Sequence, residues 1–132
     1  MFFFLQVTNN WVTGWVDWNM VLDLNGGPNW VNNLVDAPVI VNATADEFYK
    51  QPMFYALAHF AKFVPPGSVR IGLETGQASG IENVAFLTPE NVTVVVLHNI
   101  KNTDAEAVIS DSEKGSISLK IAANSMNTII YH

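Results

Sequence analysis

The run Pro65-Pro66-Gly67 divides the sequence into two parts with different hydrophobic patterns. Before it, apolar residues recur every three or four positions and so form one stripe, which is typical of a packed helix. The stripe consists of Met53, Phe54, Leu57, Ala58, Ala61 and Val64, and Phe60 and Phe63 widen it. Pro52 suits the first turn of a helix, and the Pro-Pro-Gly run ends it. The pattern predicts a helix over residues 52–64 and a boundary near residues 65–68.

After this run the sequence contains only strand patterns separated by turn residues. They cover residues 68–75, 81–88, 91–100, 106–110, 116–122 and 127–132. Their spacing is close to the ~8–12 residues typical of an antiparallel sandwich. Glu90 stands in a Pro-Glu-Asn turn between two of these patterns, so we interpret it as a turn residue and not as a catalytic acid.

The part before the helix is less regular. Residues 11–22 alternate with period two, which predicts a strand, and Gly26-Gly27-Pro28 predicts a turn. Residues 39–41 are β-branched and predict a short buried strand. The opening MFFFLQVTNN lacks the basic region and cleavage site of a signal peptide, so we interpret it as a buried strand, a helix remnant or a shortened gene start.

Composition excludes several classes of function. The net charge is −6 and only six scattered residues are Lys or Arg, which argues against a nucleic-acid partner. The chain has no cysteine, and its three histidines lack a metal-ligand spacing. We interpret His59 as an ordinary surface or half-buried residue of the helix. The Gly26-Gly27 pair lacks the lysine of a phosphate loop, so the sequence predicts no metal site and no cofactor.

Residues 13–38 combine three of the four tryptophans with several asparagines and aspartates. Indole rings stack on apolar faces and amides bind hydroxyls, so this composition suits a sugar. Glycoside hydrolysis also needs two carboxylates, and Asp17 has no second carboxylate in a comparable setting. The residues alone therefore predict a carbohydrate site. Two N-glycosylation sequons begin at Asn42 and Asn91, and they matter only in the secretory pathway.

Several longer motifs resemble one family. The runs GWVDWN, GGPNWVNN and FYKQPMFY, with the phenylalanine-rich helix after them, follow in order the C-terminal part of the glucosylceramidases of glycoside hydrolase family 30. The match continues, more weakly, through NVTVVVLHN and SMNTIIYH, whereas the first ten residues match poorly.

The resemblance implies a mixed α and β fold: the last β-strand and helix of a (β/α)8 barrel plus a C-terminal antiparallel β-sandwich. Residues 1–19 would hold the last barrel strand, and residues 20–51 a rim loop and a segment of a small antiparallel sheet. Residues 52–66 would be the last barrel helix, and residues 67–132 the sandwich. A whole barrel needs about 250 residues, so this chain cannot close one.

The same resemblance places four residues at the sugar. Trp18 would face the glucose from the end of the barrel strand, Asp17 would orient its neighbours, and Asn33 and Trp30 would reach the rim of the pocket. Core packing is the preferred interpretation for both Trp15 and Trp30, with a place at the rim of the pocket as the alternative for Trp30, whereas the motif favours a ligand role for Trp18. Leu34 stands where the family commonly has an aromatic residue. The two catalytic glutamates of the family lie on earlier strands, so no residue here is assigned as catalytic.

The implied parent is a retaining β-glucosidase that hydrolyses glucosylceramide to glucose and ceramide in the lysosomal lumen or secretory pathway. Its partners would be a glycosphingolipid at a membrane surface and the remainder of the barrel, and an activator protein is left open. The alternative is a stand-alone, non-catalytic β-sandwich module that binds a sugar or a protein. We expect the chain alone to be inactive and poorly ordered over residues 1–50, with the sandwich its most native-like part.

Overall fold

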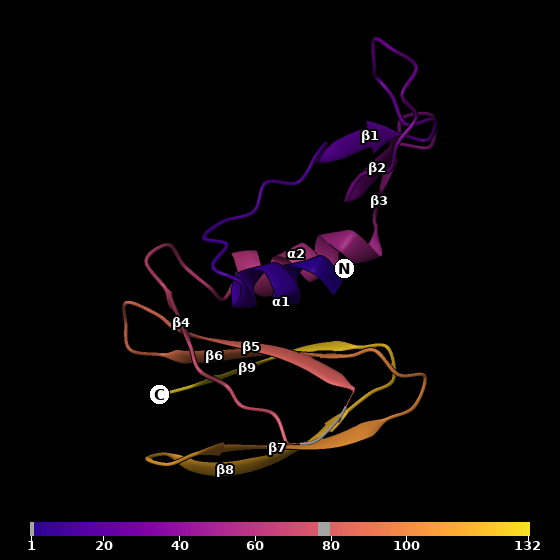
Figure 1. Ribbon diagram of the computed structural model, residues 1–132. Helices are drawn as coiled ribbons and strands as arrows, with labels where there is room; N and C mark the ends of the chain where they lie inside the picture. The colour runs from indigo at the N-terminus through magenta and orange to yellow at the C-terminus, as the bar shows by residue number, and fades with distance from the viewer. Residues whose placement is uncertain (1, 77–79) are drawn as a thin grey trace.

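The computed structural model describes residues 2–76 and 80–132 (Figure 1). In chain order the elements are α1 Phe2–Asn9, β1 Val21–Asp23, β2 Val39–Asn42, β3 Glu47–Lys50, α2 Pro52–Ala61, β4 Val69–Ile71, β5 Ile81–Leu87, β6 Thr93–Asn99, β7 Ala105–Asp111, β8 Gly115–Ile121 and β9 Met126–Tyr131. Among the described residues, no helix has the length and apolar character needed to cross a membrane.

The second half of the chain is the predicted sandwich. β4, β5, β6 and β9 form a four-stranded antiparallel sheet in that order, and β7 and β8 form a separate hairpin packed against it (Figure 1). Each of the six strand patterns read from the sequence overlaps one of these strands. Thr88–Asn91 is a turn, as interpreted, because the Asn91 amide donates to the Thr88 carbonyl over 2.9 Å.

The four-stranded sheet is covered on both faces, and its central strands accordingly carry consecutive apolar residues, at positions 84–87 in β5 and 94–97 in β6. Val94 and Val96 of β6 face α1 and α2, whereas Val95 and Leu97 face the hairpin. The same division holds for β5 and β9, with even-numbered residues toward the helices and odd-numbered ones toward the hairpin. The two resulting clusters make a three-layered body of helices, sheet and hairpin (Figure 1). The helix-side cluster is Leu5, Phe60, Phe63, Val64, Val84, Phe86, Val94, Val96 and Met126.

The first part of the chain forms a smaller sheet that projects away from this body (Figure 1). β1 pairs with β2 in parallel, and β2 pairs with β3 antiparallel. The resemblance implied a small antiparallel sheet. The sheet is instead mixed, because β1 and β2 run parallel. Its core is small and consists of Leu22, Ala37 and Ile40. We refer to residues 11–50, which include this sheet, as the aromatic arm.

Two expectations for local structure are wrong. Residues 11–20 form no strand, and only Val21 and Leu22 of the alternating segment pair with a neighbour, as part of β1. Alternation predicts a strand only where a second strand supplies hydrogen bonds, and residues 11–20 have no partner strand among the described residues. The helix ends at Ala61, three residues before the expected end. Ala61 is exposed, whereas Ala56, outside the predicted stripe, is buried.

The opening segment is a helix, one of the structures left open by its sequence. Leu5 of α1 is 1% exposed and belongs to the helix-side cluster. Asn9 at its end donates from Nδ2 to the Asn83 carbonyl over 2.8 Å, and its Oδ1 accepts from Arg70 Nε over 3.1 Å. The segment is thus fastened to β4 and β5 by both apolar and polar contacts.

Candidate functional site

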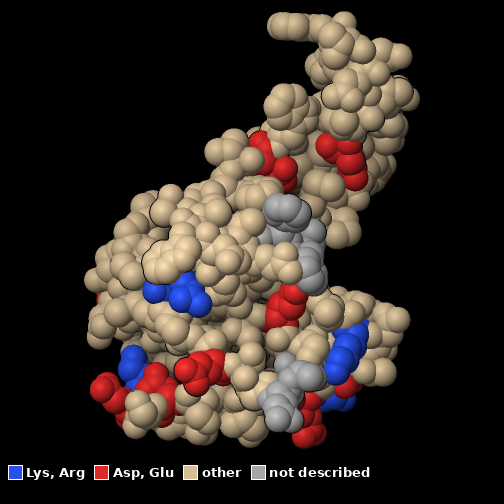
Figure 2. All heavy atoms as spheres, viewed as in Figure 1, with Lys and Arg blue, Asp and Glu red and all other residues tan. Residues whose placement is uncertain are grey.

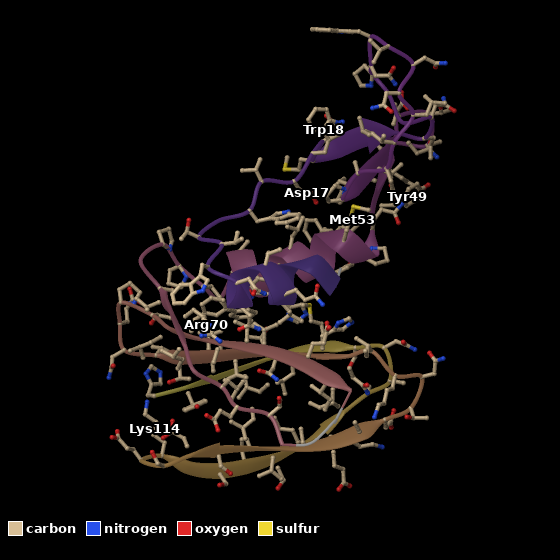
Figure 3. All side chains as sticks on the ribbon, in the orientation of Figure 1. Asp17, Trp18, Tyr49, Met53, Arg70 and Lys114 are labelled. Carbon is tan, nitrogen blue, oxygen red and sulfur yellow. The ribbon has the colours of Figure 1, made fainter. Side chains whose placement is uncertain are left out.

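Asp17 and Trp18 lie together on the aromatic arm, next to β1 and far from the hairpin that carries Lys114 (Figure 3). Trp18 is 78% exposed, so its indole is open to a ligand. Asp17 is also exposed, and its Oδ1 accepts a hydrogen bond from the Trp18 amide over 2.9 Å. This local bond replaces the ladder bonds of the expected strand and fixes the carboxylate beside the backbone of the tryptophan.

The turn after β1 is held by one carboxylate. Asp23 Oδ1 accepts from the amides of Asn25 (2.8 Å) and Gly27 (2.9 Å), and the Asp23 amide donates to the Gly27 carbonyl over 2.7 Å. Gly26 has φ 76°, and a Cβ there would lie 2.8 Å from the Val35 carbonyl oxygen. The sequence needs glycine at this position because the turn requires both a left-handed backbone and a close approach. The peptide bond from Gly27 to Pro28 is cis.

This turn presents the remaining residues of the candidate site to solvent. Trp30 has the exposure of a fully solvated side chain, at 102%, and Asn33 and Leu34 are also exposed. Core packing is therefore wrong for Trp30 in this chain. It is wrong as well for Trp15, which is 42% exposed.

Two hollows among the described residues lie away from the candidate site, and neither is lined by one of its residues. One, of about 320 Å³, lies between α1 and the edge of the large sheet, where Arg70 is (Figure 3). The other, of about 330 Å³, is lined by Lys50, Pro52, Tyr55, Ala56, His59 and Met126. The sugar site predicted from sequence is an open surface in this chain, because Asp17, Trp18, Trp30 and Asn33 are all exposed.

His59 has a structural position that the sequence did not reveal. Its Nδ1 lies 2.8 Å from Thr128 Oγ1, so α2 is joined to β9 by a polar contact as well as by packing. Burial lowers the pKa of His59 below its ordinary value of 6.5. The local sequence could not predict this contact because Thr128 lies 69 residues from His59.

No set of three or more His, Asp or Glu side chains in residues 2–76 and 80–132 could hold a metal ion. Glu82 instead pairs with His98 across β5 and β6, at 3.4 Å between Oε2 and Nδ1. On the face drawn in Figure 2, the aromatic arm carries mostly uncharged side chains with a few acidic groups. The arrangement supports stacking and hydrogen bonding to a neutral polyol more than binding of an anion.

The aromatic arm also exposes a large amount of apolar surface. All four tryptophans are exposed, and so are the following large apolar residues: Val16, Met20, Leu24, Val31, Leu34, Phe48 and Tyr49. Monomeric proteins rarely expose contiguous apolar patches larger than a few hundred Å², and larger ones mark surfaces that another part of a protein covers. The sandwich, by contrast, buries both faces of its central strands.

Comparison with known proteins assigns both parts of the chain to one family. Residues 3–64 match the glycosyl hydrolase family 30 TIM-barrel domain, and residues 67–129 match the glycosyl hydrolase family 30 beta sandwich domain. The chain is 46% identical over 120 residues to lysosomal acid glucosylceramidase of Mus musculus, covering 91% of this chain and 23% of that protein. It is 45% identical to putative glucosylceramidase 4 of Caenorhabditis elegans, over 92% of this chain and 24% of that protein.

Solved structures agree with this assignment. The endo-beta1,6-glucanase BT3312 superimposes with a TM-score of 0.86 and 26% identity, covering 94% of this chain and 28% of that one. The chain thus spans about a quarter of the length of its relatives. With its mixed α and β structure of two short helices and many strands, the chain belongs to glycosyl hydrolase family 30 and carries part of the TIM-barrel domain together with the beta-sandwich domain.

Proposed function

We propose that this chain supplies one wall of the sugar pocket, and the sandwich behind it, of a retaining β-glucosidase that hydrolyses glucosylceramide to glucose and ceramide. The observation that carries the proposal is the exposed pair of Asp17 and Trp18 on the part of the chain that matches the barrel domain. The 46% identity to a glucosylceramidase supports the choice of substrate.

Each residue has a role that suits its chemistry. Trp18 stacks on the apolar face of the glucose ring and gives the pocket its shape. Asp17 orients the groups around it, Asn33 binds a hydroxyl or the adjoining loop, and Trp30 forms part of the rim. The chain adds no cofactor and no metal to this chemistry.

The bond-breaking groups come from outside these 132 residues. One glutamate forms the glycosyl-enzyme intermediate, and the second protonates the ceramide oxygen and then activates water. Both belong to earlier barrel strands, so the chain alone hydrolyses no β-glucoside. The exposed aromatic arm supports this division, because the remainder of a barrel would cover the apolar residues that lie open here.

The proposal places the protein in the lysosomal lumen or the secretory pathway, where its substrate is a glycosphingolipid at a membrane surface. An activator protein that presents this lipid is compatible with the open aromatic arm. A second substrate class is favoured by the similarity to an endo-beta1,6-glucanase, so the assay includes a β-1,6-linked glucan.

A complementation assay tests the proposal. The chain is co-expressed with the N-terminal part of a glucosylceramidase, and cleavage of a fluorogenic β-glucoside is followed at acidic pH. We expect activity only when both pieces are present. Trp18→Ala should lower kcat/KM by about ten- to a hundredfold, or about 1.4–2.8 kcal/mol of transition-state binding. Val108→Ala, at an exposed site on the hairpin, should leave the activity unchanged.

Two results would contradict the proposal. Turnover by the chain alone would show that a catalytic pair lies within it. No activity with both pieces, together with a cooperative melt of the chain by itself, would favour the stand-alone binding module, whose folding the two cores of the sandwich support.

A further inference from the structure

The two N-glycosylation sequons have different structural settings. Asn42 begins the turn between β2 and β3, whereas Asn91 ends the turn between β5 and β6. A glycan is large and hydrated, so the asparagine that carries it must project into water in the folded protein. The surroundings of the two side chains therefore indicate which one can carry a glycan.

Asn91 lies in an exposed turn whose shape depends on other groups. The Asn91 amide donates to the Thr88 carbonyl over 2.9 Å, and the amide of Val92 donates to Thr88 Oγ1 over 3.2 Å. Pro89, Glu90 and Asn91 are all exposed. Asn91 has φ 61°, a left-handed conformation that asparagine tolerates well. The turn is thus stabilised by the Thr88 side chain and by backbone groups. The side-chain amide of Asn91 is therefore available for modification.

Asn42 is used by the fold itself. Its Oδ1 accepts from the Ala45 amide over 3.3 Å, and its Nδ2 donates to Tyr49 Oη over 3.3 Å. Tyr49 in turn donates to Glu47 Oε2 over 2.7 Å. Asn42 is partly buried and belongs to the aromatic arm, the surface that the proposed function assigns to contact with the remainder of the barrel. A glycan there would disrupt this network and obstruct that contact.

The position of the β5–β6 turn is compatible with assembly. In Figure 1 the turn lies away from β1, β2 and β3, the small sheet of the aromatic arm. It contacts the run that ends α2, since a Cβ on Gly67 would lie 3.2 Å from Pro89 Cγ. A glycan on this turn projects from the edge of the body and leaves the aromatic arm free.

We propose that Asn91 is an N-glycan attachment site and that Asn42 is a structural residue that carries none. The proposal rests on the secretory placement included in the proposed function. In the reaction, Asn91 Nδ2 attacks the first sugar carbon of an oligosaccharide carried on a lipid diphosphate. The new N–C bond forms, the bond from that carbon to the diphosphate oxygen breaks, the nitrogen gives one proton to a base of the transferase, and the lipid diphosphate leaves.

Glycan counting in a secreting host tests this assignment. The full chain is produced in insect cells behind a cleavable secretion leader, and a C-terminal reporter peptide with its own sequon identifies clones in which the chain has entered the lumen. We expect one glycan besides that of the reporter, removable by peptide N-glycosidase. Asn91→Asp, which keeps the left-handed backbone, should abolish it, and the matched variant Asn42→Asp should retain it.

Mass spectrometry of the deglycosylated peptides then assigns the site. A glycan on Asn42, or none on Asn91 in chains whose reporter is modified, would overturn the proposal. This count needs no catalytic activity, so it can succeed where the complementation assay fails. It can also fail where that assay succeeds, and the two proposals are therefore judged separately.

Discussion

At the scale of single residues, His59 makes the attachment of α2 sensitive to pH. Burial lowers its pKa, so the folded protein favours the neutral ring that contacts Thr128. The stabilisation is complete above the unfolded pKa of 6.5 and is lost as pH falls through the lower folded value. We expect the melting temperature to fall between pH 8 and pH 5 by more in the wild type than in His59→Gln. Parallel curves would contradict this account.

Asn99 is the residue whose loss should destabilise the sandwich most directly. It is 0% exposed, and its Nδ2 donates to the carbonyls of Thr103 (2.9 Å) and Ala122 (3.0 Å) while its Oδ1 accepts from the Lys101 amide (3.0 Å). Asn99→Ala leaves these groups unpaired and should lower the free energy of unfolding by about 1–3 kcal/mol in urea denaturation. Asn102→Ala, at an exposed position of the same loop cluster and outside the left-handed region, should change it by less than about 0.5 kcal/mol.

At the scale of elements, the turn that follows β1 determines how Trp30 is presented. Gly26→Ala forces a side chain into a left-handed position and against the Val35 carbonyl, and should cost about 1–3 kcal/mol of local stability. Hydrogen exchange of the small sheet should accelerate accordingly. Gly14→Ala is the matched control, because a Cβ at Gly14 meets no atom within 4 Å. Equal exchange in both variants would show that the turn is not held by this glycine.

The elements also show what the sequence can predict. The strands of the sandwich were predictable because each is a short run rich in β-branched or apolar residues and is bounded by turn residues, as in β5 and β6. Residues 11–20 alternate equally well but form no strand, since pairing depends on a neighbour that the local sequence does not specify. The contact of His59 with Thr128 was unpredictable for the same reason. Trp18 and Asp17 were found through motifs, and their role at a sugar remains a prediction.

At the scale of the whole molecule, the exposed tryptophans predict a change on assembly. In the chain alone Trp11, Trp18 and Trp30 are 93%, 78% and 102% exposed, so their emission should resemble that of tryptophan in water and be strongly quenched by acrylamide. Addition of the missing part of the barrel should shift the emission to shorter wavelength and reduce quenching. Unchanged emission in a mixture that has gained activity would show that the aromatic arm is not the contact surface.

The division of the large sheet into even and odd positions has a consequence for substitutions in its central strand. Neighbouring residues of β6 belong to different cores, so a defect at Val94 or Val96 would loosen the helices, and a defect at Val95 or Leu97 would loosen the hairpin. Two equally severe substitutions at neighbouring positions of β6 would then weaken different parts of the molecule. The parity of the residue number in β6 would then indicate whether a defect first affects the packing of the helices or that of the hairpin.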